Sequence, residues 1–147
     1  MSWPFVLILI VALAGVFVLA RRHRSAHTRA AAPDIQALPP VEVRDALARR
    51  SVPLLYFTSA GSPETRRLQD PAVFMLNAEF EGRVTVIRRE IGEHAMLAGQ
   101  FGIVSAPSTV VFDHRGNVAA VNRGYARLEE LRMQVLRARS LEWTMGA

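Results

Sequence analysis

The residues best placed to do chemistry stand at the start of a predicted helix: Ser62, Pro63, Glu64 and Thr65. A serine acts as a nucleophile when a neighbouring base takes its proton, and histidine is the usual base. None of the four histidines is close to Ser62 in the sequence: His23, His27, His94 and His114. His23 and His27 could share one helix face, but no third metal ligand is near them. We therefore expect no catalytic residue, no metal site and no cofactor.

The same four residues suit the first turn of a helix. The Ser62 hydroxyl can accept a hydrogen bond from a free backbone N–H, Pro63 fits the first helical position, and Glu64 suits the positive end of the helix dipole. A functional alternative is anion binding at this helix N-terminus, aided by Arg66 and Arg67. Glu64 already occupies that positive field and would repel an anion. We therefore favour the structural interpretation.

Composition excludes one kind of chemistry outright. The 147 residues contain no cysteine. Disulfide exchange needs a thiolate to attack and a thiol to leave, so this chain cannot oxidise or reduce a dithiol by itself. The absence of cysteine does not decide the compartment, because cytosolic proteins and some exported ones lack disulfides.

The spacing of apolar residues predicts an α/β domain over residues 41–140. After an initial helix, the expected element order is βαβαββα. The expected helices cover residues 41–50, 62–80, 93–101 and 127–139. The expected strands cover residues 52–58, 84–88, 109–112 and 118–122, with a hairpin turn at His114-Arg115-Gly116-Asn117. This order predicts a central mixed sheet with helices on both faces.

A run of eight residues carries a family resemblance: Gly102-Ile103-Val104-Ser105-Ala106-Pro107-Ser108-Thr109. It resembles the thioredoxin loop that contains a cis-proline and faces the active-site turn. The resemblance implies that Pro107 follows a cis peptide bond and that the backbone of Ala106 contacts an extended peptide. The alternative is that Pro107 simply begins a strand, as proline often does. We favour the cis-proline because the hairpin and final helix follow it in the thioredoxin order.

The segment from Tyr56 to Pro71 resembles the active-site strand, turn and helix of thioredoxins. The resemblance puts Ser62 at the first cysteine position and Thr65 at the second, with Arg66 as the basic residue that follows. Pro71 resembles the proline that kinks the thioredoxin helix, but it lies one residue further from the turn. We therefore expect an insertion in this helix, which leaves the register of the turn open by one residue.

Two further positions depart from the thioredoxin pattern. Thioredoxins bury an acid in the strand before the turn, where this chain has Tyr56. They also place an aromatic residue before the first cysteine, where this chain has Gly61. Gly124 does match the glycine near the end of the thioredoxin sheet. The fold markers are therefore kept, while thiols, proton acceptor and aromatic cover are all missing.

The N-terminal segment predicts a membrane anchor. Residues 3–20 carry no charge and are almost wholly apolar, which at about 1.5 Å per residue is enough to cross a bilayer. A signal peptide is the alternative, but it would have its basic residues before the apolar segment, and here they follow it. Residues 21–40 are then expected to form a tether, residues 41–140 the thioredoxin-like domain, and residues 141–147 a tail.

Positive charge is concentrated beside the expected anchor. Of the net charge of +5, residues 21–40 contribute +3, from four arginines against one acid. We expect Arg21, Arg22 and Arg24 to contact anionic lipid, and we expect no nucleic-acid partner. Because positive flanks stay in the cytoplasm, the expected location is the plasma membrane of a prokaryote-like cell, as a single-pass protein with a cytoplasmic domain. The pairs Arg66-Arg67 and Arg88-Arg89 are expected to be solvated ends of elements.

Taken together, these features predict a membrane-tethered thioredoxin-like domain without dithiol activity. Its expected binding groove for an extended protein segment consists of Gly61, Ser62, Pro63, Thr65, Ala106 and Pro107. Two alternatives remain open. One is a relative of the thiol-disulfide oxidoreductases that acts only with a partner's cysteines, and the other is a structural subunit of a membrane complex.

Overall fold

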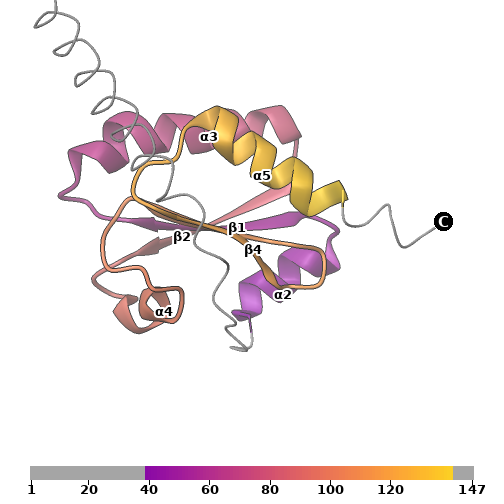
Figure 1. Cartoon of the computed structure of the whole chain (residues 1–147), viewed down its shortest axis with the longest axis horizontal. Helices are drawn as coiled ribbons and strands as arrows, with labels where there is room; N and C mark the ends of the chain where they lie inside the picture. The colour runs from indigo at the N-terminus through magenta and orange to yellow at the C-terminus, as the bar shows by residue number, and fades with distance from the viewer. Residues whose placement is uncertain (1–38, 141–147) are drawn as a thin grey trace, which may run out of the picture. The chain divides into compact units, whose positions relative to one another are not determined.

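The computed structural model describes residues 39–140, which belong to the second of two compact units, residues 32–147 (Figure 1). The expected anchor (3–20), nearly all of the tether (21–40) and the tail (141–147) lie outside the described residues. Between residues 39 and 140, no helix is long and apolar enough to cross a membrane.

The described elements alternate as the sequence predicts. The helices are α2 (Val41–Ala48), the π-helical turn η1 (Thr65–Gln69), α3 (Asp70–Phe80), α4 (Ala95–Gln100) and α5 (Leu128–Ser140). The strands are β1 (Val52–Thr58), β2 (Val84–Glu90), β3 (Ser108–Phe112) and β4 (Val118–Arg123). This order confirms the predicted α/β fold, with boundaries that shift by a few residues.

The strands form one mixed sheet in the order β2-β1-β3-β4. β1 pairs with β2 in parallel and with β3 in antiparallel fashion, and β3 pairs with β4 as a hairpin. The hairpin turn lies where the sequence predicts it, closed by the bond from the Asp113 N–H to the Asn117 carbonyl at 2.9 Å. Gly116 in this turn has a φ of 83°, which a side chain would oppose.

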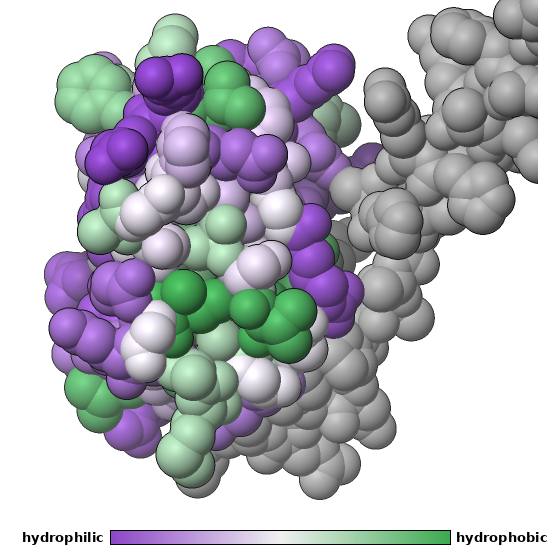
Figure 2. Space-filling view, turned by 90° about the vertical axis from the view of Figure 1, so that its left-hand side faces the viewer, coloured by the Kyte–Doolittle hydropathy of each residue, from purple (hydrophilic) through white to green (hydrophobic). Residues whose placement is uncertain are grey.

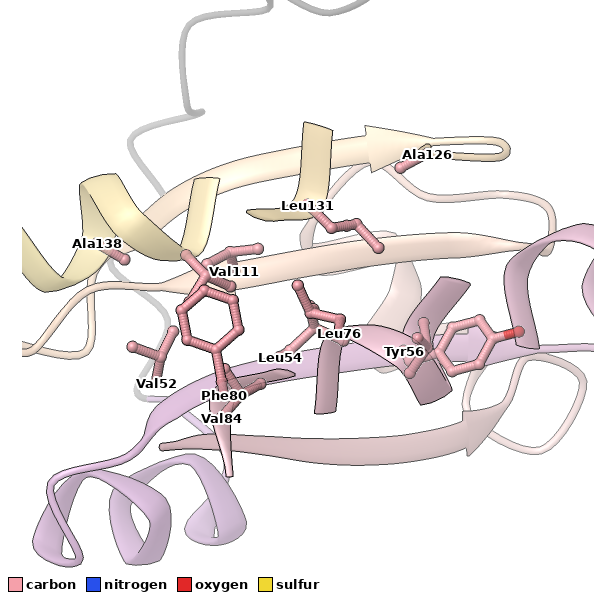
Figure 3. Close-up of a cluster of buried hydrophobic side chains, with 12 residues drawn as sticks. Val52, Leu54, Tyr56, Leu76, Phe80, Val84, Val111, Ala126, Leu131 and Ala138 are labelled. Atoms are coloured by element: carbon pink, nitrogen blue, oxygen red, sulfur yellow. The ribbon is translucent and has the colours of Figure 1, made fainter. Parts of the chain in front are cut away.

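Helices cover both faces of the sheet (Figure 1). Alternate residues of a strand point to opposite faces, so Leu54 and Tyr56 pack with α3 and α5, whereas Leu55 and Phe57 pack with α2 and α4. All four side chains are fully buried. Figure 3 shows the first of these clusters, with the Tyr56 ring at one end and its hydroxyl pointing away from the other side chains.

The helix after β1 contains the extra residue that the position of Pro71 predicts. It begins at Pro63 as α-helix, widens into the π-helical turn η1 and continues as α3. The Asp70 N–H donates to the Thr65 carbonyl, five residues earlier, where an α-helix would bond four residues earlier. The π-helical turn begins at Thr65, after the first residues of the helix.

The π-helical turn also turns Gln69 into the core. Its side chain is fully buried and holds the backbone of Ala126, in the loop between β4 and α5. Gln69 Nε2 donates to the Ala126 carbonyl at 3.1 Å, and the Ala126 N–H donates to Gln69 Oε1 at 2.9 Å. These two bonds satisfy an irregular, buried stretch of backbone that no strand or helix serves.

We expect Gln69→Leu to lower the free energy of unfolding by roughly 1–3 kcal/mol, because it leaves the buried N–H and carbonyl of Ala126 without partners. Urea denaturation would measure this loss. The matched control is Gln100→Leu at an exposed position of α4, which should stay within about 0.5 kcal/mol of the wild type. Equal effects of the two substitutions would contradict the role given to Gln69.

Candidate functional site

Strand pairing brings the two thioredoxin-like segments together at one end of the sheet. Phe57 pairs with Ser108, so extending the antiparallel register by one residue sets Thr58 opposite Pro107. The Ser62 turn leaves the sheet immediately after Thr58, and the loop that contains Ala106 enters immediately before Ser108. The peptide bond between Ala106 and Pro107 is cis.

The Ser62 turn is a capped helix start, as the residue types predict. The Ser62 N–H donates to the Ser59 carbonyl at 3.1 Å, and Ser62 Oγ accepts from the Thr65 N–H at 3.2 Å. Arg66 Nη1 donates to the Ala60 carbonyl at 3.1 Å, which closes the turn from outside. The hydroxyl that could have been a nucleophile is thus a helix cap, and no histidine within residues 39–140 bonds to it.

The loop before β3 is held by side chains from the strands behind it. Arg123 Nε donates to the Gly102 carbonyl at 2.8 Å, and its Nη2 donates to the Phe101 carbonyl at 3.0 Å. Ser108 Oγ donates to the Ser105 carbonyl at 2.7 Å and accepts from the Gly124 N–H at 3.3 Å. The loop is therefore fixed at both ends, close to Ala106.

Ala106 itself is left without backbone partners. Within residues 39–140, neither its N–H nor its carbonyl forms a hydrogen bond, although the residue is half-buried. Pro107 next to it is buried. Backbone N–H and carbonyl groups are strong hydrogen-bonding groups, so those of Ala106 are left for water or for another chain to satisfy.

The other candidate residues differ in how far they reach the surface. Gly61 and Pro63 are exposed, Ser62 is half-buried, and Thr65 is buried. A Cβ added at Gly61 would meet no atom within 4 Å, so nothing covers the turn where thioredoxins carry an aromatic residue. Thr65 Oγ1 is buried and has no hydrogen-bond partner in the described part of the chain.

Apolar side chains gather on the surface at this end of the domain (Figure 2). The two most exposed large apolar side chains of the described region are Val104, at 93%, and Met96, at 89%. Val104 lies two residues before Ala106, and Met96 belongs to α4, which lies at the same end of the sheet (Figure 1). The unpaired backbone of Ala106 is therefore accompanied by an apolar surface.

Tyr56 stands where thioredoxins bury an acid, and it is locked into a static contact. Its hydroxyl donates to Asp70 Oδ1 at 2.7 Å, and Arg88 Nη2 donates to the same oxygen at 3.0 Å. The Arg88 guanidinium also lies over the Tyr56 ring, 5.1 Å from its centroid. Burial, and secondly the hydrogen bond to Asp70, raise the pKa of Tyr56 well above its usual value. This position therefore cannot accept a proton near neutral pH.

The sequence analysis missed several of these contacts. Arg88 and Arg89 lie near the end of β2, as expected, and Arg88 is exposed, but the ion pairs that they form with Asp70 and Glu42 respectively were not predicted. Asp70 was not singled out, and Gln69 carried no signal because its burial depends on the π-helical turn. No cluster of metal-ligating side chains occurs in residues 39–140.

Comparison with solved structures shows the fold of this domain. A mutant thioredoxin from Halobacterium salinarum has a TM-score of 0.58 and 19% identity, with coverage of 67% of this chain and 84% of that one. Chloroplastic thioredoxin z has a TM-score of 0.56 and 17% identity, with coverage of 70% and 92%. MTB dsbF has a TM-score of 0.52 and 19% identity, with coverage of 60% and 81%. The domain has a thioredoxin-like fold. No family model and no curated protein matches the sequence.

The backbone features of a thioredoxin-like site are present in this domain, but the thiol groups are absent. The turn and the cis-proline loop are both formed, but the chain has no cysteine and therefore no thiol for disulfide exchange. The arrangement supplies hydrogen-bonding backbone and apolar surface, which are means of binding. It supplies no nucleophile with an adjacent base.

The raised pKa of Tyr56 predicts how stability depends on alkaline pH. The unfolded chain releases the tyrosine proton near pH 10, whereas the folded chain keeps it to a higher pH. Stability from this group is therefore complete below about pH 10 and is lost as the pH rises above it. We expect Tyr56→Phe to flatten this alkaline decline in urea denaturation, after a loss of roughly 1 kcal/mol at neutral pH. Tyr125→Phe, at the exposed tyrosine, should leave the decline in place. A decline unchanged by Tyr56→Phe would contradict this assignment.

Proposed function

We propose that this thioredoxin-like domain binds an extended protein segment at the groove between the Ser62 turn and the Ala106–Pro107 loop, without redox chemistry. The observation that carries the proposal is the backbone of Ala106, whose N–H and carbonyl have no partner within residues 39–140. An extended segment could bond to both groups and so add main-chain hydrogen bonds at this end of the sheet.

Two properties of the groove support this proposal. The loop is fixed by Arg123 and Ser108, so its backbone is already in place when a partner arrives, and little ordering entropy is lost. Val104 and Met96 offer apolar contacts at the same end, and the open space at Gly61 leaves the turn accessible. Main-chain bonds would provide affinity for many sequences, while these side chains would favour segments with apolar residues.

Ala106→Pro tests the proposal because it removes the N–H donor. We expect the full-length protein carrying it to lose binding to a library of immobilised peptides by about tenfold or more, from one lost hydrogen bond and a blocked approach. The matched control is Ala106→Gly, which keeps the N–H and should bind within a few-fold of the wild type. Thermal unfolding of both variants checks that they are folded. Peptide binding unchanged by Ala106→Pro would sink the proposal and favour the structural-subunit alternative.

We further propose that residues 3–20 anchor the domain in the plasma membrane with the domain in the cytoplasm. The uncharged length of this segment and the basic run that follows it support this orientation, as does attraction of Arg21, Arg22 and Arg24 to anionic lipid. A groove held at the inner surface of a membrane would meet segments of cytoplasmic proteins or of inner-leaflet complexes.

The lack of native cysteines makes this orientation directly measurable. Ser105→Cys puts a thiol at an exposed position of the domain, and Ser2→Cys puts one before the expected anchor. With a membrane-impermeant thiol reagent, we expect Ser2→Cys to be labelled in intact cells and Ser105→Cys only after lysis. Labelling of both variants in intact cells, or of neither, would mean that residues 3–20 do not separate the two positions. The reverse pattern would put the domain outside.

A further inference from the structure

A concave site lies at the end of the sheet opposite to the proposed groove. It is a pocket of about 80 Å³, several times the 10–15 Å³ or so that one water molecule needs. Its polar lining comes from segments far apart in the sequence: Arg50, Ser51, Arg83, His114 and Arg139. Leu47, Val52 and Ala138 complete the walls.

The charge of this pocket is positive and unbalanced. Three arginines are among the described residues that line it, and no acidic residue is. In residues 39–140, no carboxylate pairs with Arg50, Arg83 or Arg139, whereas Arg88, Arg89 and Arg132 each have an acidic partner. His114 Nδ1 is buried and has no hydrogen-bond partner within the same residues. Each of these groups can donate a hydrogen bond to an anion.

A purely structural explanation accounts for part of this charge. The helices α2, α3 and α5 all end beside the pocket, and each helix C-terminus carries a partial charge of about −0.5. Arg83 Nε indeed donates to the Phe80 carbonyl, the last residue of α3, at 3.1 Å. Three such ends offset at most about half of the charge of three arginines. Among residues 39–140, the pocket therefore keeps a positive excess that no carboxylate neutralises.

We propose that this pocket binds the phosphate group of an anionic ligand. Guanidinium groups match phosphate oxygens in charge and in paired hydrogen-bond geometry, and converging arginines are the usual means of phosphate recognition. The pocket also lies where the chain enters the domain. A Cβ on Gly116 would lie 3.3 Å from Leu47 of the pocket wall and 3.5 Å from Pro39, the first described residue. The phosphate could thus come from a lipid headgroup near the expected anchor or from a soluble phosphate.

The test compares thermal unfolding of the full-length protein, in an uncharged detergent, with and without each of two probes at constant ionic strength. The probes are inorganic phosphate and dihexanoyl phosphatidylglycerol. A ligand that binds only the folded state raises Tm with concentration, which gives an apparent Kd. We expect the double variant Arg50→Asn with Arg139→Gln to weaken this Kd by about tenfold or more. Asparagine is chosen because position 50 has a φ of 56°, which it tolerates.

A matched double variant, Arg67→Gln with Arg127→Gln, removes the same charge from exposed positions outside the pocket and should bind as the wild type does. This control separates the pocket from the general stabilising effect of phosphate salts. A pocket-dependent rise with the lipid alone would identify a headgroup site, and one with inorganic phosphate would identify a site for soluble phosphate. Equal responses of the two double variants, or no response to either probe, would overturn the proposal.

Discussion

The antiparallel pairing of β1 with β3 is the constraint on which the candidate groove depends. β1 ends in the Ser62 turn and β3 begins after Pro107, so their register alone decides whether these two segments meet. Both strands are central in the sheet and nearly all of their residues are buried. A one-residue slip would move every side chain of a strand to the other face, exchanging Leu54 and Tyr56 for Leu55 and Phe57. The packing of two helical layers therefore fixes the geometry of the groove.

Around this constraint, Ser62 and Tyr56, which the sequence resemblance put at or near the thioredoxin active site, form structural hydrogen bonds. Ser62 caps the helix with a 3.2 Å hydrogen bond, and the Tyr56 hydroxyl donates a hydrogen bond to Asp70, which also accepts one from Arg88. These contacts stabilise the folded state and move no protons. Thr65 is the exception, because its buried hydroxyl has no partner in the described region. The Thr65 side chain fills this buried space with its methyl group, but its hydroxyl oxygen is left without a hydrogen bond, which is unfavourable.

The sequence predicted the element order well because each element has its own local signal. Apolar runs mark β1 and β3, Ser62-Pro63-Glu64 marks a helix start, and the position of Pro71 indicated one inserted residue. What it could not predict depends on geometry between elements. Gln69 looks like a surface residue until the π-helical turn rotates it inward, and the contacts of Arg88 with Asp70 and the Tyr56 ring arise only in the folded chain. The unpaired N–H and carbonyl of Ala106 could not be predicted from the sequence, because they are recognised only by the lack of hydrogen bonds to them within residues 39–140.

The direction of the helices gives the two ends of the domain helix dipoles of opposite sign. α3 and α5 begin near the groove end and finish at the pocket end, since β1 and β4 both run toward the groove. Acids lie near the helix starts, with Glu64 before η1 and Glu129 and Glu130 in the first turn of α5, and they match the positive dipole ends. Arg137 and Arg139 lie in the last turn of α5, and Arg50 and Arg83 follow the ends of α2 and α3. At the proposed groove, these acids offset the positive helix ends and so disfavour anion binding. Main-chain hydrogen bonds and apolar contacts are then the means of recognition. At the pocket, the three positive charges of the arginines exceed the three partial negative charges of the helix C-termini. The remaining positive charge would attract an anion.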